Sequence, residues 1–390
     1  MPGKHAILSA SAAHRWIHCT PSARLTEDIE DTSSDFAREG TLAHELAELE
    51  LNYQLKNINK RKYTTELKKI QAHELYSADM PDYVAVYTGY VFEKLAEAKT
   101  RSSDALVFLE QKLDFSKWVP EGYGTGDTVI ISDGVIEIVD LKYGKGVEVS
   151  ADDNPQMMLY GLGAWYEYEA FYDLQMVKMT IVQPRLDAIS TFETGVETLL
   201  DWTVKTLMPA AEKAWNGEGE LIAGDHCKFC KVKATCRARA KYNIEFLDKN
   251  KEADELKSPH LLAPSEVSQI LAMAMEVKNW LKDVEENALV KALEGVKFPG
   301  YKLVEGRSNR TYGDEKEVAA TLKLEDYTEE QIYNIKLKGI TDMEKLLGKK
   351  MFTQLLGTYI VKPSGKPTMV PESDKRTELN TAADDFNLEI

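Results

Sequence analysis

Four short fragments, widely spaced along the chain, carry side chains that metal-dependent hydrolysis of a phosphodiester needs. They are GTLAH, GTGD, IVDLK and QMMLY, which end at His44, Asp127, Lys142 and Tyr160. The histidine and the carboxylates of Asp127 and Asp140 offer the nitrogen and oxygen atoms that bind a divalent cation such as Mg²⁺ or Mn²⁺. Lys142 follows Asp140 by two residues, so both side chains leave the same face of a strand. The lysine ammonium is then expected beside the cation, where it can orient water or neutralise charge on the phosphate.

Sequence patterns also predict the elements that position these side chains. Residues Asp35 to Leu51 have the apolar spacing of an amphipathic helix, and His44 lies on it. Three strands and a later extended segment are predicted at Ala105–Phe115, Asp127–Asp133, Val135–Tyr143 and Met176–Pro184. The dipeptide Asp133-Gly134 is typical of a two-residue hairpin, so the second and third strands should be antiparallel neighbours.

A second helix is predicted to begin just after the third strand. Asn154 is a favourable N-cap residue and Pro155 is suited to the first helical position. On such a helix Gln156 and Tyr160 are one turn apart and share a face. The predicted order is therefore helix, three strands, helix, strand.

The order and motifs resemble those of the PD-(D/E)xK nuclease superfamily, in its RecB-like branch. That branch carries a GxxxH helix, a GxxD strand, a (D/E)-hydrophobic-K strand and a QxxxY helix. The resemblance covers roughly the first 240 residues, on domain-size expectations. It implies an α/β, restriction-endonuclease-like core in which helices flank a mixed central sheet. The whole chain also resembles an uncharacterised family of RecB-like proteins of phages and prophages.

The resemblance implies a role for each matching residue. It makes His44, Asp127 and Asp140 metal ligands, with the backbone carbonyl of Leu141 as a fourth, and it makes Lys142 the catalytic lysine. Gln156 and Tyr160 would contact the nucleic acid near the scissile phosphate. Glu110, on the strand before GTGD, matches an acidic position often seen in these enzymes, though less specifically.

Each residue also has a plainer interpretation. His44 alone could be a satisfied histidine on a half-buried helix. Asp140 and Lys142 could form an exposed ion pair of little energetic value. The residues beside Asp140 are apolar, however, and a buried carboxylate is costly unless a cation compensates it. The ordered set of four fragments therefore favours the nuclease interpretation.

The cysteines provide a second, independent signal. There are four, namely Cys19, Cys227, Cys230 and Cys236. The first residues lack the apolar core of a secretory signal, which predicts a cytoplasmic protein whose thiols bind a metal rather than form disulfides. A structural zinc site usually shows two close pairs of ligands, whereas here one cysteine precedes the predicted core and three follow it.

This spacing is similar to that of RecB-like nucleases that carry a 4Fe-4S cluster. The resemblance implies that the cluster joins the start of the chain to the end of the nuclease domain. Zinc in the same place stays open, because His18 and His226 each precede a cysteine and could substitute as ligands. Unliganded, buried cysteines are the remaining alternative.

The net charge restricts how nucleic acid could bind. A formal charge of −16 argues against nonspecific coating of duplex DNA but allows a local basic channel. The run from Lys228 to Tyr242 contains no acid, and its basic residues are Lys228, Lys231, Lys233, Arg237, Arg239 and Lys241. Because this run surrounds three of the cysteines, we predict that it tracks a nucleic-acid backbone. A second basic run spans Lys56 to Lys62, and either run could be an ordinary solvated face.

The C-terminal part shows no recognisable chemistry. We predict a nuclease domain over residues 1–247 and a mainly helical region over 248–390, with a boundary near Asp248 to Pro264. Helices are expected at Ser265–Leu293, Glu315–Leu322 and Ile340–Leu347, and a short strand at Gly300–Val304. The stretch Gly357–Arg376 should be extended and the acidic end disordered.

The sequence therefore predicts a DNA nuclease with a divalent metal and an iron–sulfur cluster. Exonuclease action on single-stranded ends, and a role in phage-type recombination, replication or repair, follow from the resemblance alone. No P-loop motif occurs, so a helicase would be a separate partner, as would a single-strand-binding or annealing protein. No apolar run is long enough to cross a bilayer, so no membrane partner is expected. The alternatives are a catalytically silent DNA-binding or scaffold module and a zinc-stapled interaction protein.

Overall fold

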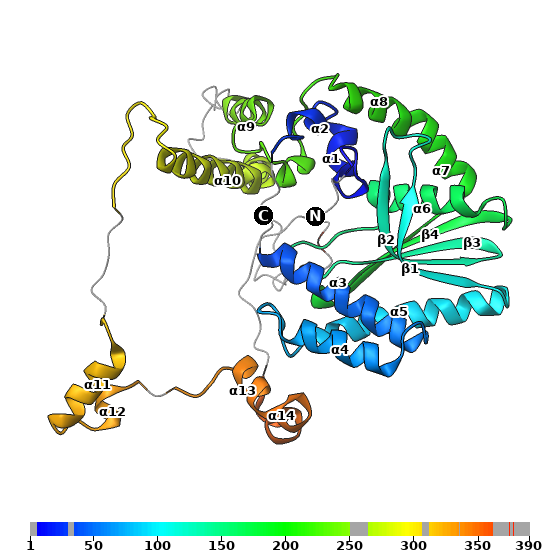
Figure 1. The fold of residues 1–390 in the computed structure, drawn as a ribbon. Coiled ribbons are helices and arrows are strands. Elements are labelled where there is room, and N and C mark those ends of the chain that lie inside the picture. Colours follow the sequence, from blue (N-terminus) through cyan, green and yellow to red (C-terminus); the bar gives the residue numbers. More distant parts are fainter. Residues whose placement is uncertain are drawn as a thin grey trace, which may run out of the picture. The chain divides into compact units, whose positions relative to one another are not determined.

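The computed structural model describes residues 6–29, 35–249, 264–305, 312–334 and 336–361, and positions 374 and 377 (Figure 1). The chain divides into two compact units, one of Met1–Leu261 with Glu276–Asn287, the other of Leu262–Met275 with Ala288–Ile390. Most of the predicted domain boundary, Asp248 to Pro264, lies outside the described residues, and the division after residue 247 stays a prediction. Among the described helices, none has the length and apolar character needed to span a bilayer.

A five-stranded mixed sheet forms the centre of the first unit. Its strands are β1 (Leu106–Asp114), β2 (Tyr123–Ser132), β3 (Gly134–Leu141), β4 (Leu174–Gln183) and β5 (Ala188–Gly195), hydrogen-bonded in that order. The β3–β4 pair is parallel and the other pairs are antiparallel. A parallel pair needs a crossover connection, which helix α6 (Pro155–Tyr168) supplies.

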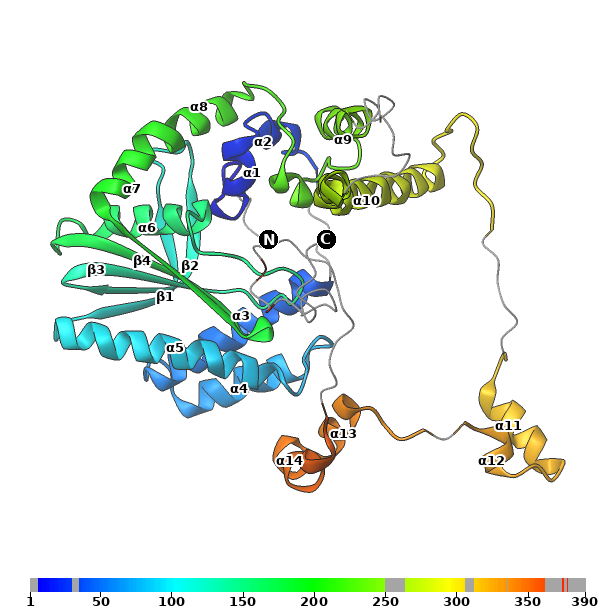
Figure 2. The same ribbon diagram turned by 180° about the vertical axis from the view of Figure 1, so that it is seen from behind.

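Three helices cover one face of the sheet: α3 (Asp35–Gln54), α4 (Lys60–Gln71) and α5 (Met80–Arg101) (Figures 1 and 2). Apolar side chains of α3 and α5 form a buried cluster with Val139, Leu141 and Val182 of the sheet. Because strand side chains alternate, Val139 and Leu141 face these helices while Asp140, between them, faces the opposite side.

The opposite face is covered by α6, α7 (Val196–Trp202) and α8 (Met208–Asn216), with a π-helical turn at Thr203–Leu207 (Figures 1 and 2). The short N-terminal helices α1 (Ala13–His18) and α2 (Ser22–Leu25), preceded by a 3₁₀ turn at Ala10–Ala12, pack against this layer. Ile136 and Ile138 of β3 belong to its buried core. The predicted mixed sheet between two helical layers is thus confirmed.

The cysteine-rich segment follows this layer. It contains a 3₁₀ helix at Asp225–Phe229 and then α9 (Arg237–Lys249). Helix α10 (Pro264–Leu293) has its Glu276–Asn287 segment in the first unit. This helix agrees with the predicted Ser265–Leu293.

The second unit is mainly helical, as predicted. Its short helices are α11 (Glu315–Leu324), α12 (Glu329–Ile332), α13 (Ile340–Leu347) and α14 (Lys349–Leu356), and a 3₁₀ turn spans Gly357–Tyr359. The strand predicted at Gly300–Val304 is wrong, because no described segment pairs with it and a strand needs a hydrogen-bonded partner. The predicted extended stretch Gly357–Arg376 begins with the 3₁₀ turn instead. Most of its remainder, and the acidic end, lie outside the described residues.

Local sequence signals account for the elements that carry the site. The hairpin forms at Asp133-Gly134, where Gly134 has a φ of +76°, in the left-handed region that glycine tolerates. The side chain of Asn154 caps α6 by accepting hydrogen bonds from the backbone N–H groups of Gln156 at 3.1 Å and Met157 at 3.3 Å. This cap fixes the first turn of the helix that carries Gln156.

Replacing Asn154 by alanine is therefore expected to destabilise the first unit by about 1 kcal/mol, because two backbone donors lose their acceptor. Asn154→Asp keeps the acceptor and serves as the control. Urea unfolding monitored by circular dichroism measures both changes. Equal stability of Asn154→Ala and the wild-type protein would contradict this role of the cap.

Candidate active site and cysteine pocket

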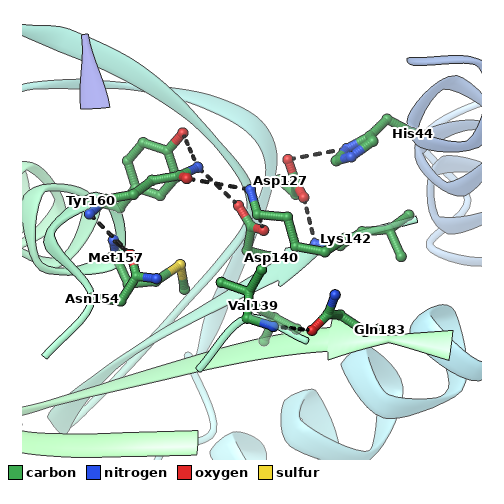
Figure 3. A network of polar contacts seen from close by, with 12 residues as sticks. His44, Asp127, Val139, Asp140, Lys142, Asn154, Met157, Tyr160 and Gln183 are labelled. Carbon is green, nitrogen blue, oxygen red and sulfur yellow. Dashed lines mark hydrogen bonds and ion pairs between the residues drawn. The ribbon is translucent and has the colours of Figure 1, made fainter. Parts of the chain in front are cut away.

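Asp127 connects helix α3 to the end of β3. Its Oδ1 lies 3.3 Å from Nδ1 of His44, and its Oδ2 accepts a 2.7 Å hydrogen bond from the backbone N–H of Leu141 (Figure 3). Asp127 precedes the first β2–β3 pair, Thr128 with Val139, and its carboxylate accepts from the backbone of β3 where the strand pairing has not yet begun. The histidine helix and the GxxD strand thus come together, while the metal-binding role of both residues stays a prediction.

Glu110 faces Asp127 from the neighbouring strand β1. The pairing of β1 with β2 skips both residues, although the residues on either side are paired. Glu110 has a φ of +49°, a left-handed conformation that costs a residue with a side chain about 1–3 kcal/mol. One ligand atom from each of His44, Glu110 and Asp127 can be chosen so that all three lie within 4.8 Å of one another.

The surroundings of Glu110 and His44 raise the pKa of both side chains. Although Glu110 is exposed as a whole residue, partial burial of its carboxyl and the nearby charge of Asp127 raise its pKa to about 7. For His44, burial lowers the pKa, but the hydrogen bond and charge of Asp127 outweigh this and leave it raised. Both residues therefore bind a proton more readily than the free side chains do, so a cation bound here would compete with protons.

Asp140, Lys142 and Gln156 form a closed ring of contacts beside this group. The Lys142 ammonium lies 3.0 Å from Oδ2 of Asp140 and donates to Oε1 of Gln156 at 3.3 Å. The Gln156 amide in turn donates to Oδ1 of Asp140 at 3.3 Å and to the Tyr160 hydroxyl at 3.0 Å (Figure 3). The strand pair and the helix pair predicted from sequence thus meet in one network.

The protonation of this ring follows from burial and pairing. Asp140 is 2% exposed, and burial raises its pKa although the Lys142 charge opposes the shift. Burial lowers the pKa of Lys142, but the Asp140 and Asp127 charges prevail and raise it. Lys142 is therefore protonated and positively charged in the site.

Tyr87 of α5 contacts both strands that carry the site. Tyr87 of α5 is fully buried and its hydroxyl lies 2.8 Å from the Thr128 hydroxyl, on the residue after Asp127. The same hydroxyl donates to the carbonyl of Val139 at 3.4 Å, on the residue before Asp140. No sequence motif had indicated this tyrosine, because the contact depends on α5 packing across the two strands.

The structure groups the predicted ligands in a different way from the prediction. Asp140 was expected with His44 and Asp127 around one cation, but the trio that converges among the described residues contains Glu110 in its place. Asp140 lies instead with Lys142 and Gln156. The backbone N–H of Leu141 donates to Asp127, and the metal-binding role expected of the Leu141 carbonyl stays a prediction. The ligand set for Asp140 therefore stays a prediction.

The residues present fit a hard divalent cation. One imidazole and several carboxylates are the donors that Mg²⁺ and Mn²⁺ use in proteins. Oδ2 of Asp140 is fully buried and, apart from its ion pair with Lys142, accepts no well-aligned hydrogen bond from the described residues. A cation would also relieve the repulsion between the carboxylates of Glu110 and Asp127.

Glu110→Gly is expected to stabilise the metal-free protein and to remove most of its stabilisation by Mn²⁺. Glycine adopts a φ of +49° without strain, and the substitution removes the carboxylate that Asp127 repels. Thermal unfolding with chelator and with Mn²⁺ measures both effects. Glu110→Gln, which removes the charge and keeps the strain, should give a smaller gain. A lower melting temperature of Glu110→Gly in chelator would contradict the strain assigned to this residue.

The four cysteines line one pocket. Cys19, Cys227 and Cys230 are buried and Cys236 is half-buried. The pocket brings the N-terminal cysteine next to the three that follow the core, because helix α1 packs against the 3₁₀ helix Asp225–Phe229. The grouping of one plus three cysteines expected from the spacing is present, and its metal stays a prediction.

His226 is an additional residue of this pocket. It is 6% exposed, and its Nε2 lies 2.8 Å from the carbonyl of Ile222, so this nitrogen carries a proton. Hydrogen bonds to Cys19 and Cys227 raise the pKa of His226 to about 10. His18, the other predicted alternative ligand, stacks on the His226 ring at 5.7 Å but does not line the pocket.

The basic run around the cysteines is partly used within the fold. Arg239 is 1% exposed, and its guanidinium pairs with Glu276 at 2.8 Å and Asp283 at 2.6 Å. Lys233 pairs with Asp283 at 2.9 Å. The predicted phosphate contact of Arg239 is therefore wrong. Its guanidinium forms structural ion pairs, and because it is buried and neutralised it is not accessible to a nucleic-acid strand.

The other residues of the predicted nucleic-acid run remain at the surface. Lys228, Lys231 and Arg237 are exposed, and the Lys231 ammonium donates to the carbonyl of Ile29 at 2.6 Å. The second basic run, Lys56–Lys62, forms the turn before α4 and its first residues, and its charged side chains are exposed. A contact of either run with nucleic acid stays a prediction.

Comparison with known proteins gives two findings. The crystal structure of SSO0001 is similar over 58% of this chain and 96% of that chain, with 13% identity and a TM-score of 0.20. The model of a family described as "Protein of unknown function (DUF2800)" matches residues 5–377, nearly the whole length. The chain therefore belongs to the DUF2800 family.

Proposed function

We propose that this protein is a divalent-metal-dependent nuclease that hydrolyses phosphodiester bonds of DNA. The observation that carries the proposal is the close placement of two groups, which are linked where Asp127 accepts a hydrogen bond from the backbone of Leu141, between Asp140 and Lys142. One is the convergent trio His44, Glu110 and Asp127, and the other is the ring of Asp140, Lys142 and Gln156. Acidic ligands next to a charged lysine are what hydrolysis of a phosphodiester needs.

His44, Glu110 and Asp127 would hold the cation, with Asp140 as the neighbouring anionic donor. A bound Mg²⁺ or Mn²⁺ would supply a Lewis acid that polarises the phosphate and makes water more acidic. The Asp127 carboxylate has a fixed orientation, because one oxygen contacts His44 and the other accepts from the backbone of Leu141. Lys142, held by Asp140, presents its ammonium to the phosphate oxygens or to the attacking water.

Gln156 and Tyr160 would contact the nucleic acid near the scissile phosphate. Their hydrogen bond to each other, and the Gln156 bonds to Asp140 and Lys142, orient both side chains from the start of α6. This fixed orientation lowers the entropic cost of binding a substrate. Burial and the Asp140 charge raise the pKa of Tyr160 far above neutral pH. The hydroxyl therefore stays protonated and would act as a hydrogen-bonding group rather than as a base.

For the cysteine pocket we propose a 4Fe-4S cluster, with zinc as the alternative. Four thiols from two ends of the domain line one pocket, and thiolates are the usual ligands of both groups. The likeness to RecB-like nucleases of phages and prophages extends the proposal to exonuclease action on single-stranded ends, in recombination, replication or repair. A separate helicase, single-strand-binding or annealing protein would then be the partner.

The competing proposal is a catalytically silent DNA-binding module with the same fold. It predicts binding without cleavage. The carboxylate–lysine ring argues against it, because an architectural protein gains nothing from a buried Asp140 whose pKa is raised by burial.

The test is incubation of the anaerobically purified protein with end-labelled single-stranded and double-stranded DNA. We expect products with Mg²⁺ or Mn²⁺ and none with chelator, and product lengths over time report the polarity. Binding without products under every metal condition would support the silent module instead.

A further inference from the structure

The loop after Lys142 presents one exposed cation beside the site. Tyr143 at its start is 3% exposed, whereas Gly144, Lys145 and Gly146 at its tip are all exposed. Within the part of the chain that the structure describes, the Lys145 ammonium has no hydrogen bond or ion pair. Glu148, the acidic residue of the loop, is engaged in an interaction of its own. The loop tip therefore offers an exposed positive charge that no described residue pairs with.

The far end of the loop is clamped by a buried amide. Gln183, at the end of β4, is 2% exposed. Its Oε1 accepts a 2.6 Å hydrogen bond from the N–H of Val149, and its Nε2 donates to the carbonyl of Val147 at 3.0 Å. Figure 3 shows Gln183 in the same close view as Asp140 and Lys142. Both ends of one side-chain amide are thus used to hold two loop residues.

The start of the loop is held by Arg185, which follows Gln183 by two residues. The Arg185 guanidinium lies 4.8 Å from the ring centre of Tyr143 and pairs with Glu39 at 2.8 Å. Glu39 belongs to α3, five residues before His44. The brace therefore connects the root of the loop to the helix that carries the metal-binding histidine. A loop held at both ends loses less conformational entropy when its tip binds a ligand.

We propose that Lys145 contacts a backbone phosphate of the nucleic-acid strand bound at the active site, and that Gln183 positions the loop for this contact. The inference rests on the proposed function and names a substrate contact beyond the predicted motif residues. Lys145 follows Lys142 by three positions, so the two Cα atoms are at most about 11 Å apart. Because successive phosphates of one duplex strand advance about 3.4 Å along the helix axis, the contact is expected within a few nucleotides of the scissile phosphate.

The test compares binding of a fluorescent single-stranded oligonucleotide by full-length variants, with chelator present so that cleavage does not interfere. One phosphate contact contributes about 0.7 to the slope of log K against log salt, or about fivefold in affinity at 0.1 M relative to 1 M salt. We expect Lys145→Ala to lose this amount of slope and affinity. Lys213→Ala on α8 removes the same charge from an exposed position on a helix outside the site, and should change neither.

Gln183→Met supplies the second arm, because it keeps the size of the side chain and removes both loop hydrogen bonds. We expect it to weaken binding although Lys145 is intact, with a smaller effect in the Lys145→Ala background. A Lys145→Ala protein with wild-type affinity and salt slope would overturn the inference, and if the wild-type protein still cleaves DNA the proposed function survives. A wild-type protein that neither binds nor cleaves DNA would overturn both.

Discussion

Replacing Asp140 by asparagine is expected to abolish cleavage, by about a thousandfold or more, while the protein stays folded. The substitution removes the anionic partner that holds the Lys142 ammonium at 3.0 Å and a donor beside the metal ligands. It should not unfold the protein, because burial already raises the pKa of Asp140 and a neutral amide avoids that cost. Lys142→Ala should reduce the rate about a hundredfold, as expected for loss of one transition-state donor.

The matched control is Glu137→Gln. Glu137 is also 2% exposed and lies on β3, three residues before Asp140. It contacts Arg101 at 3.8 Å rather than the active-site ring, so its substitution should leave cleavage unchanged. Initial rates with Mn²⁺ at matched protein concentration measure all three variants. Wild-type activity of Asp140→Asn, or an equal loss in Glu137→Gln, would show that this ring is not the catalytic centre.

Replacing Cys19 by alanine is expected to remove the metal of the cysteine pocket and to lower the melting temperature about as much as Cys230→Ala does. Cys19 lies roughly two hundred residues from its partners, so a shared metal closes a very long loop and restricts the unfolded chain. Anaerobically purified wild-type protein should be brown with about four irons per chain. Visible absorption, metal analysis and thermal unfolding measure these effects.

Ser22→Ala is the control for the pocket. Ser22 lines the same pocket and is 2% exposed, and its hydroxyl has no hydrogen-bond partner among the described residues. Its loss should leave colour and metal content unchanged. One zinc per chain in a colourless preparation would support the zinc alternative. Unchanged colour and melting temperature in Cys19→Ala would contradict a metal site shared by the four cysteines.

Strong local patterns predicted the elements that hold the active site. Helix α3 begins at the predicted Asp35 and extends three residues beyond the predicted Leu51. The β2–β3 hairpin turns at the predicted dipeptide, and Asn154 caps α6 as expected. These features depend on residues close in sequence. The contacts of Lys142 with Asp140 and of Gln156 with Tyr160 followed from the two-residue and four-residue spacings, because such spacings place side chains on one face.

Features that depend on long-range packing could not be predicted. Strand β5 was missed because most of its residues are exposed or half-buried and its pattern lacks a strong apolar alternation. The place of Glu110 among the converging ligands depends on an interruption of the β1–β2 pairing and a left-handed backbone, which no local residue type signals. Arg239 belonged to a basic run, but its burial depends on Glu276 and Asp283, about forty residues later on α10.

The central claim is that the converging acidic site, with a bound divalent cation, cleaves DNA. The most direct measurement is single-turnover cleavage of an end-labelled oligonucleotide by the wild-type protein and by Asp127→Asn, with Mn²⁺ titrated from zero in metal-free buffer. We predict a rate that rises to saturation with Mn²⁺ in the wild-type protein, falls to background with chelator, and is absent at every Mn²⁺ concentration in Asp127→Asn. Cleavage by Asp127→Asn at the wild-type rate, or wild-type cleavage that persists in chelator, would contradict the claim.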